Sequence, residues 1–140
     1  NIGSHQRHNY TAIGDGVNLA ARLESLCKMY NLRILISEDA LSKATSPFPG
    51  IFEVDRVQVK GRGSATRIYS QVSPELEREI PAYEEGLRHY YVARWKAAMA
   101  CFSMAPGIPC VRTLSDRCFK AIDEGELKNW KDGVWVLSSK

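Results

Sequence analysis

The sequence predicts an α+β fold in which a strand-and-helix half precedes an all-helical half. Apolar residues over 10–72 follow the order strand, helix, strand, helix, strand, strand. Beyond the middle of the chain their spacing is helical. Between these halves lies a short segment rich in Pro, Glu and Arg, which has the composition of a linker. We therefore expect three parts: residues 1–72, a linker at 73–81 and a tail at 82–140.

Local signals support each element of the first half. Asp15 lies in a Gly-Asp-Gly turn and can cap the helix that follows, because Asp is a preferred N-cap residue. Glycines on both sides of Arg62 allow a tight turn, so we expect the last two strands to pair as a hairpin. The expected elements are strand 10–13, helix 17–30, strand 33–37, helix 38–44, strand 52–60 and strand 67–72. Together they make half of an α/β sandwich rather than a complete domain.

The tail is expected to be a small all-helical unit. Residues 83–104 have helical spacing with a break near 91–94, and residues 109–123 form a further helix. The small and large residues spaced as in a tetratricopeptide-type (TPR-like) helical hairpin are Gly86, Ala98, Phe102 and Ala105. One such repeat cannot bury its own apolar face, so we expect it to dock on another surface. We expect the aromatic segment 129–137 to cap this unit.

Composition excludes several classes of function. The 19 basic and 16 acidic residues are spread along the chain with a net charge of +3, so we expect no nucleic-acid partner. No apolar run reaches the roughly 20 residues of a membrane-spanning helix, so we expect no membrane segment in this chain. The four cysteines form no CxxC pair and the three histidines lack zinc-type spacing, so we expect no metal site. Cys27, Cys101 and Cys118 are expected to be buried thiols in helices.

The densest chemical signal is the pair Asn18 and Arg22. Four residues apart on one helix, their side chains leave the same face. An amide and a guanidinium near a helix start suit a sugar oxygen and a phosphate, because the Arg fork matches phosphate oxygens and the helix dipole attracts anions. Spacing alone leaves another interpretation open, in which Arg22 pairs with Glu24 and Asn18 caps a local turn.

The whole segment from Asn1 to Glu24 resembles the catalytic domain of class III adenylyl and guanylyl cyclases, where a strand, a Gly-Asp turn and an Asn-x-x-x-Arg helix follow in this order. The resemblance implies that Asn18 orients the ribose and that Arg22 stabilises charge on the attacked phosphate. It implies that Thr11 reads the base edge, as in a bacterial-type subclass of adenylyl cyclases, although a β-branched strand residue is the plainer alternative.

A second matching motif is Val-Lys-Gly-Arg-Gly at 59–63, which by resemblance puts Lys60 near the terminal phosphates of the substrate. The family fold is a ferredoxin-like α/β sandwich, and the match corresponds to its C-terminal part. In the family, two aspartates hold Mg²⁺ or Mn²⁺, and they come from strands that would precede residue 1. No metal ligand is therefore expected in this chain, and the 140 residues alone are expected to be inactive.

The tail is also similar to a helical segment that follows the catalytic domain in some bacterial-type cyclases. The residues that match it are Gly86, Tyr90, Trp95, Ala98 and Phe102. The resemblance implies a cytoplasmic signalling domain that converts ATP to 3′,5′-cyclic AMP and pyrophosphate and pairs with a second cyclase domain, as a homodimer, within a full-length protein that can be membrane-anchored. Two alternatives stay open: a guanylyl cyclase, or a non-catalytic scaffold that binds a protein partner through the tail.

Overall fold

The computed structural model describes residues 11–13, 22–45, 49–59 and 64–137. Its elements in chain order are β1 (Thr11–Ile13), α2 (Leu23–Tyr30), β2 (Ile34–Ser37), α3 (Glu38–Ser42), β3 (Ile51–Val59), β4 (Thr66–Gln71), the 3-10 helix η2 (Pro74–Glu79), α4 (Ile80–Tyr91), α5 (Trp95–Phe102), α6 (Val111–Glu124), β5 (Trp130–Lys131) and β6 (Val134–Leu137). This mixed α+β architecture confirms the predicted fold class at the coarse level, and the predicted order of elements holds throughout the described part of the first half.

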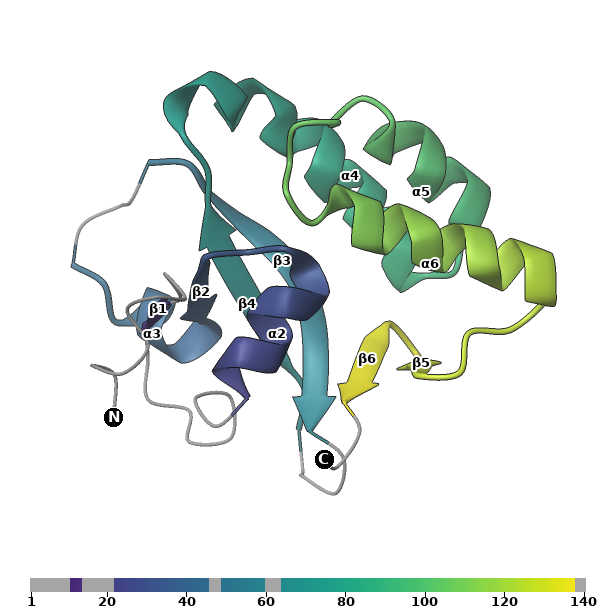
Figure 1. Ribbon diagram of the computed structural model, residues 1–140, viewed down its shortest axis with the longest axis horizontal. Helices are drawn as coiled ribbons and strands as arrows, with labels where there is room; N and C mark the ends of the chain where they lie inside the picture. The colour runs from purple at the N-terminus through teal and green to yellow at the C-terminus, as the bar shows by residue number, and fades with distance from the viewer. Residues whose placement is uncertain (1–10, 14–21, 46–48, 60–63, 138–140) are drawn as a thin grey trace.

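One mixed sheet organises the described residues. Its strand order is β1-β2-β4-β3-β6-β5. The β3–β4 pair is the predicted antiparallel hairpin, β2 pairs antiparallel with β4, and β1 pairs parallel with β2. Helices α4, α5 and α6 lie together beside the sheet, and α2 lies across it close to β3 (Figure 1). A single apolar core includes residues of α2, β3, α4, α5 and α6.

The end of the chain differs from the prediction of an all-helical tail. Segment 129–137 forms a hairpin in which β5 pairs antiparallel with β6, and β6 adds to β3 in parallel. Asp132 and Gly133 have φ values of 51° and 86°, and positive φ at both central residues is typical of the tight turns that favour Asp-Gly. The all-helical expectation is therefore wrong here, because the Asp-Gly turn and the short apolar strand after it allow this segment to pair with β3.

A β-bulge in β3 determines which side chains enter the core. The register with β4 shifts between Glu53 and Asp55. A bulge adds one residue to one strand, so the alternation of faces is interrupted at that point. As a result Val54 and Asp55 are consecutive and both are fully buried. Simple alternation from Phe52 would direct Asp55 to the opposite face of the sheet.

The helical hairpin of α4 and α5 docks on β3. The helices break at residues 92–94, within the predicted range of 91–94, with Ala93 in the left-handed region at φ 63°. The hydroxyl of Tyr83 donates to the carbonyl of Val54 at 2.7 Å, and its ring meets Phe52 edge-on at 5.5 Å. The expected docking surface is thus the sheet itself, and 73–81 is mostly the 3-10 helix before α4. The TPR-like character of the hairpin stays a prediction.

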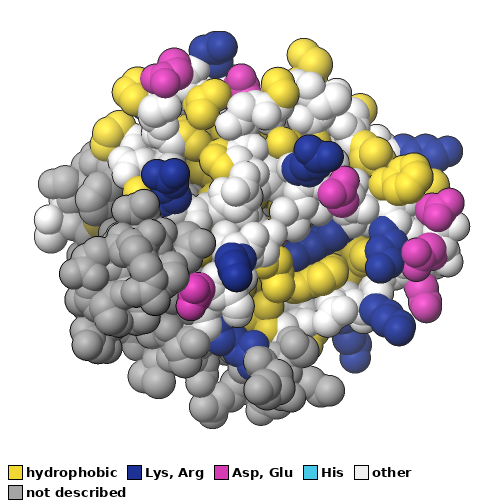
Figure 2. All heavy atoms as spheres, in the orientation of Figure 1, with side chains coloured by type: hydrophobic (Ala, Val, Ile, Leu, Met, Phe, Trp, Pro, Cys, Tyr) yellow, Lys and Arg dark blue, Asp and Glu magenta, His cyan; other side chains and the backbone are white. Residues whose placement is uncertain are grey.

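Charged side chains are dispersed over the visible surface. On the face in Figure 2, basic and acidic groups lie among hydrophobic ones without forming one continuous basic patch. None of the helices described here has the length and apolar character needed to cross a membrane.

Gly86 permits the close approach of α4 and α5. A Cβ at this position would lie 2.6 Å from the Phe102 ring and 3.2 Å from the Ala98 carbonyl oxygen. We predict that Gly86→Ala lowers the free energy of unfolding by about 1–3 kcal/mol through overpacking, despite the better helix propensity of Ala. Chemical denaturation measures this change. Gly125→Asn is the control, because Gly125 has φ 77° with no neighbour within 4 Å and Asn tolerates that conformation. An unchanged or higher stability for Gly86→Ala would contradict the proposed packing.

Candidate functional site

The structure describes two of the four residues predicted from the sequence to contact substrate. Thr11 begins β1, where its backbone is paired with Ile34 of β2. Arg22 is half-buried at the N-cap of α2, and its carbonyl accepts a hydrogen bond from the Leu26 amide at 2.9 Å. Asn18 and Lys60 lie outside the described residues. The directions of the strands show where the described neighbours of these four residues lie.

The strand directions bring the flanks of the predicted site to one edge of the sheet. The pairings give β1, β2, β3 and β6 one direction and β4 and β5 the other. The last residues of β1 and β3, Ile13 and Val59, therefore lie toward the same edge. Since α2 connects two parallel strands, it must run back across the sheet and begin at that edge. Figure 1 shows the start of α2 and the end of β3 at the lower end of the view.

The start of α2 carries charges of both signs, because Arg22 is its N-cap residue and Glu24 lies in its first turn. Backbone amides in the first turn of a helix lack partners within the helix and attract negative charge. Arg22 places a guanidinium at the same end, where the helix dipole disfavours a cation unless an anion is bound. Within the described ranges no ion pair links Arg22 to a carboxylate.

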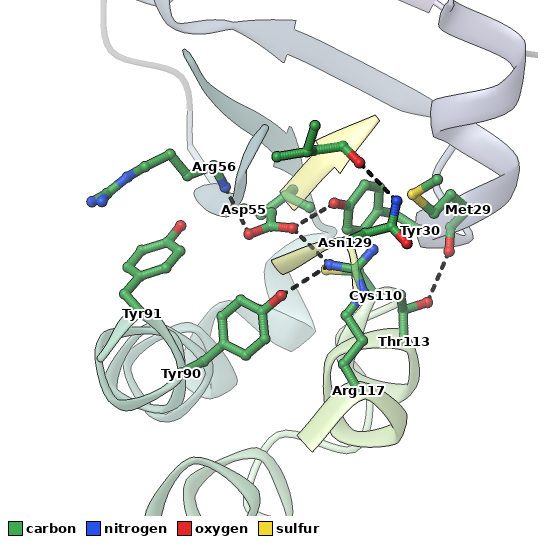
Figure 3. A network of polar contacts seen from close by, with 12 residues as sticks. Met29, Tyr30, Asp55, Arg56, Tyr90, Tyr91, Cys110, Thr113, Arg117 and Asn129 are labelled. Carbon is green, nitrogen blue, oxygen red and sulfur yellow. Dashed lines mark hydrogen bonds and ion pairs between the residues drawn. The ribbon is translucent and has the colours of Figure 1, made fainter. Parts of the chain in front are cut away.

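A second group of functional interest is a buried polar network that the sequence analysis missed. We call it the Asp55 cluster and define it by five residues from five elements: Tyr30, Asp55, Tyr90, Arg117 and Trp135. Figure 3 shows Tyr30, Asp55, Tyr90 and Arg117 pointing toward one another from α2, β3, α4 and α6. The ring of Trp135, from β6, lies against the guanidinium with its centroid 3.4 Å from the central carbon.

Both oxygens of the Asp55 carboxylate have donors. Oδ2 accepts from the Tyr30 hydroxyl at 2.5 Å and from Arg117 Nη1 at 2.9 Å, and Oδ1 accepts from the Arg56 amide at 2.7 Å. Arg117 Nη1 also donates to the Tyr90 hydroxyl at 3.1 Å. Asp55 is fully buried and Arg117 is 6% exposed. The cluster is therefore a satisfied network in the core.

Burial and pairing act in opposite directions on these groups. Burial raises the pKa of the Asp55 carboxyl, and the Arg117 charge and the Tyr30 hydrogen bond oppose that rise. Burial also lowers the pKa of Arg117, but the surrounding Tyr30, Tyr90 and Asp55 outweigh it and raise the pKa above its usual value. The pKa of Tyr30 rises mainly through burial. Because Arg117 keeps its charge, Asp55 is the group that balances it inside the core.

The sequence carried a signal for this cluster. Arg117 falls on the buried stripe of α6 between Leu114 and Cys118, and Asp55 lies among the buried apolar residues of β3. A charged residue on the apolar face of an amphipathic helix needs a buried partner. The sequence did not identify Asp55 as that partner, because an alternation pattern does not reveal the bulge that turns Asp55 inward.

The described residues offer no metal centre of their own. No group of three or more His, Cys, Asp or Glu in the described part of the chain is arranged to hold an ion. The thiols of Cys27 and Cys118 are buried in α2 and α6, as predicted, and the Cys110 thiol donates to the Tyr83 hydroxyl at 3.2 Å. The divalent metal expected for a cyclase therefore does not fit the donor sets of the described residues.

Comparison with curated proteins relates the chain to adenylate cyclases. It is 33% identical over 141 aligned positions to the terminal-differentiation specific adenylate cyclase of Dictyostelium discoideum, covering 91% of this chain and 7% of that protein. It is 38% identical over 71 residues to adenylate cyclase 2 of Rhizobium meliloti, covering 50% of this chain and 20% of that protein. An adenylate cyclase of Anabaena cylindrica is 39% identical over 70 residues, covering 49% of this chain and 14% of that protein. No family model and no solved structure matches.

These matches establish distant homology to adenylate cyclases over much of the chain. The chain spans only a small part of the length of each of these relatives, a fifth at most. Residues 1–72 make up about half of the 140, so a match over 91% must include most of the tail as well. The Dictyostelium protein thus shares sequence with both halves.

Removing one partner of the buried ion pair should lower the free energy of unfolding more than removing both partners. We predict that Arg117→Met lowers the free energy of unfolding by about 3–5 kcal/mol, because it leaves the Asp55 charge buried without its cation. The double variant Asp55→Asn with Arg117→Met should recover part of this loss, since no charge then stays buried. Denaturant unfolding of the three proteins measures both values. Equal stability of the Arg117→Met variant and the parent would contradict the described pairing.

Thiol reactivity should follow burial. Burial raises the pKa of Cys27 to about 11 and that of Cys110 and Cys118 to about 12, so at pH 8 these thiols stay protonated and unreactive. Cys101 lies in α5 as predicted, but the prediction of its burial is wrong, because its side chain is only partly buried. We predict that iodoacetamide at pH 8 modifies Cys101 first in the native protein and all four cysteines in denaturant. Mass spectrometry of tryptic peptides identifies the sites, and rapid native labelling of Cys118 would contradict the described core.

Proposed function

We propose that this chain is part of an adenylyl cyclase that converts ATP to 3′,5′-cyclic AMP and pyrophosphate. The observation that carries the proposal is the match to the Dictyostelium adenylate cyclase over 91% of the chain. The shared edge at which β1 and β3 end and α2 begins supports it, because the proposed substrate residues adjoin these elements in sequence. The names of the three adenylate cyclases compared above favour adenylyl over guanylyl cyclase activity.

The proposed roles follow from where charge develops. The ribose 3′-hydroxyl attacks the α-phosphate and pyrophosphate leaves, so negative charge grows on the phosphate oxygens. Arg22 presents a planar guanidinium whose parallel N–H groups match those oxygens. Asn18, four residues earlier in the sequence, would hold the ribose so that its hydroxyl is in line. Thr11 would contact the adenine edge, and Lys60 would hold the terminal phosphates.

The rest of the site would come from outside these 140 residues. Mg²⁺ or Mn²⁺, when bound, would activate the hydroxyl and neutralise phosphate charge. As the resemblance to class III cyclases implies, we propose that two aspartates outside these 140 residues would hold it. We propose that the composite site forms between two cyclase domains, in a homodimer. We further propose that this domain is cytoplasmic and that its tail binds a protein partner.

Cyclic nucleotide formation by the full-length protein tests the proposal. With Mn²⁺ and ATP we expect cyclic AMP, and with GTP much less cyclic GMP. Asn18→Ala and Arg22→Ala should each lower turnover by roughly 100-fold or more, because each removes a fixed donor to the transition state. Arg33→Ala, the loss of an exposed arginine just before β2, serves as the matched control and should keep the parental rate. A folded parent that forms neither product, or variants with parental rates, would refute the assignment.

A further inference from the structure

The Asp55 cluster lies between the tail and the two elements that carry the proposed site. Arg117 comes from α6, in the tail, whereas Tyr30 ends α2 and Asp55 lies in β3. In the described structure both Tyr30 and Arg117 contact the same carboxylate oxygen, Oδ2 of Asp55. The tail, α2 and β3 are thus joined at one buried atom (Figure 3).

A second contact from the same face of α6 reaches the same end of α2. The hydroxyl of Thr113 donates to the Met29 carbonyl at 2.9 Å. Thr113 and Arg117 are four residues apart on α6, so their side chains lie on one face of the helix. That face therefore contacts the last turn of α2 at two points, one through backbone and one through the Asp55 cluster.

Because α2 is a short helix, the position of its C-terminal turn affects the position of its N-terminal end. From Tyr30 back to Arg22 is eight residues, or about 12 Å of helix at 1.5 Å per residue. A small tilt at Tyr30 therefore displaces Arg22 at the opposite end. Asp55 lies four residues before Val59, the last residue of β3, so the same carboxylate also lies on the strand that leads to Lys60.

We propose that Arg117 is a positioning residue for the cyclase site: through Asp55 and Tyr30, and with Thr113, it fixes α2 relative to β3 and makes the geometry of the proposed transition-state residues depend on the docked tail. This inference rests on the proposed cyclase function. It assigns to the tail a direct part in setting turnover, beyond packing. Rigid burial suits this role, because Arg117 is held by an ion pair, a tyrosine hydroxyl and the Trp135 ring at once.

Mild variants test the proposal without unfolding the core. Tyr30→Phe removes only the hydroxyl on Asp55, and Thr113→Val removes only the donor to Met29. In the full-length protein each should lower kcat for ATP by roughly tenfold, since a displacement of about 1 Å at a catalytic group can cost up to about 100-fold. The KM for ATP should stay within about twofold, as expected when transition-state geometry rather than binding is impaired. Arg117→Lys should keep more activity than Arg117→Met.

The matched control is Arg112→Met, which removes an exposed arginine from the same helix. Its kcat should equal that of the parent. Amide hydrogen exchange at residues 24–30 is the second readout: Tyr30→Phe and Thr113→Val should speed exchange in α2 while leaving α4 protected. A purely structural role would speed exchange or lower the melting temperature without a fall in kcat below melting.

Two negative results are distinguishable. If the parent forms cyclic AMP and Arg22→Ala abolishes it, yet Tyr30→Phe and Thr113→Val keep the parental kcat, the positioning role is overturned and the proposed function stands. If the folded parent forms no cyclic AMP with Mn²⁺, the proposed function fails, and the positioning role fails with it.

Discussion

The buried pairing of Asp55 with Arg117 is the interaction on which the arrangement of the described elements depends. A carboxylate and a guanidinium removed from water lose several kcal/mol of hydration each, so the pair persists only with good geometry and further hydrogen bonds. Tyr30, Tyr90 and the Arg56 amide provide those bonds, and they come from α2, α4 and β3. Few other positions of these elements would leave both charges satisfied. We infer that the pair contributes more to the uniqueness of the packing than to its free energy.

This constraint links the two halves that the sequence separated at residue 72. The apolar core and the sheet both continue across that point, since β6 pairs with β3 and the α4 side chain of Tyr83 binds the backbone of Val54. The homology to the Dictyostelium adenylate cyclase likewise extends into the tail. A docked tail explains why a helical segment too short to bury its own face is stable beside the sheet.

Sequence patterns predicted the local elements of this chain better than their assembly. The break at 92–94 and the β3–β4 hairpin followed from helical spacing and from the glycine turn. The β5–β6 hairpin was missed although Asp132-Gly133 is a recognised turn signal, because its strands are only two and four residues long. Asp55 was missed because a bulge reverses the face that simple alternation assigns. For the proposed site, motif resemblance named the residues, and the strand directions support a common edge only for their described neighbours.

The parallel pairing of β3 with β6 has a consequence for biosynthesis. Val57 and Trp135 are paired although they lie 78 positions apart in the sequence. A ribosome makes the chain from the N-terminus, so one side of β3 stays without its partner until the last residues of this segment emerge. An open strand edge of this kind is a template for association with other chains. We infer that truncation before residue 130 would harm solubility during synthesis, and that chaperones would engage the nascent chain at this stage.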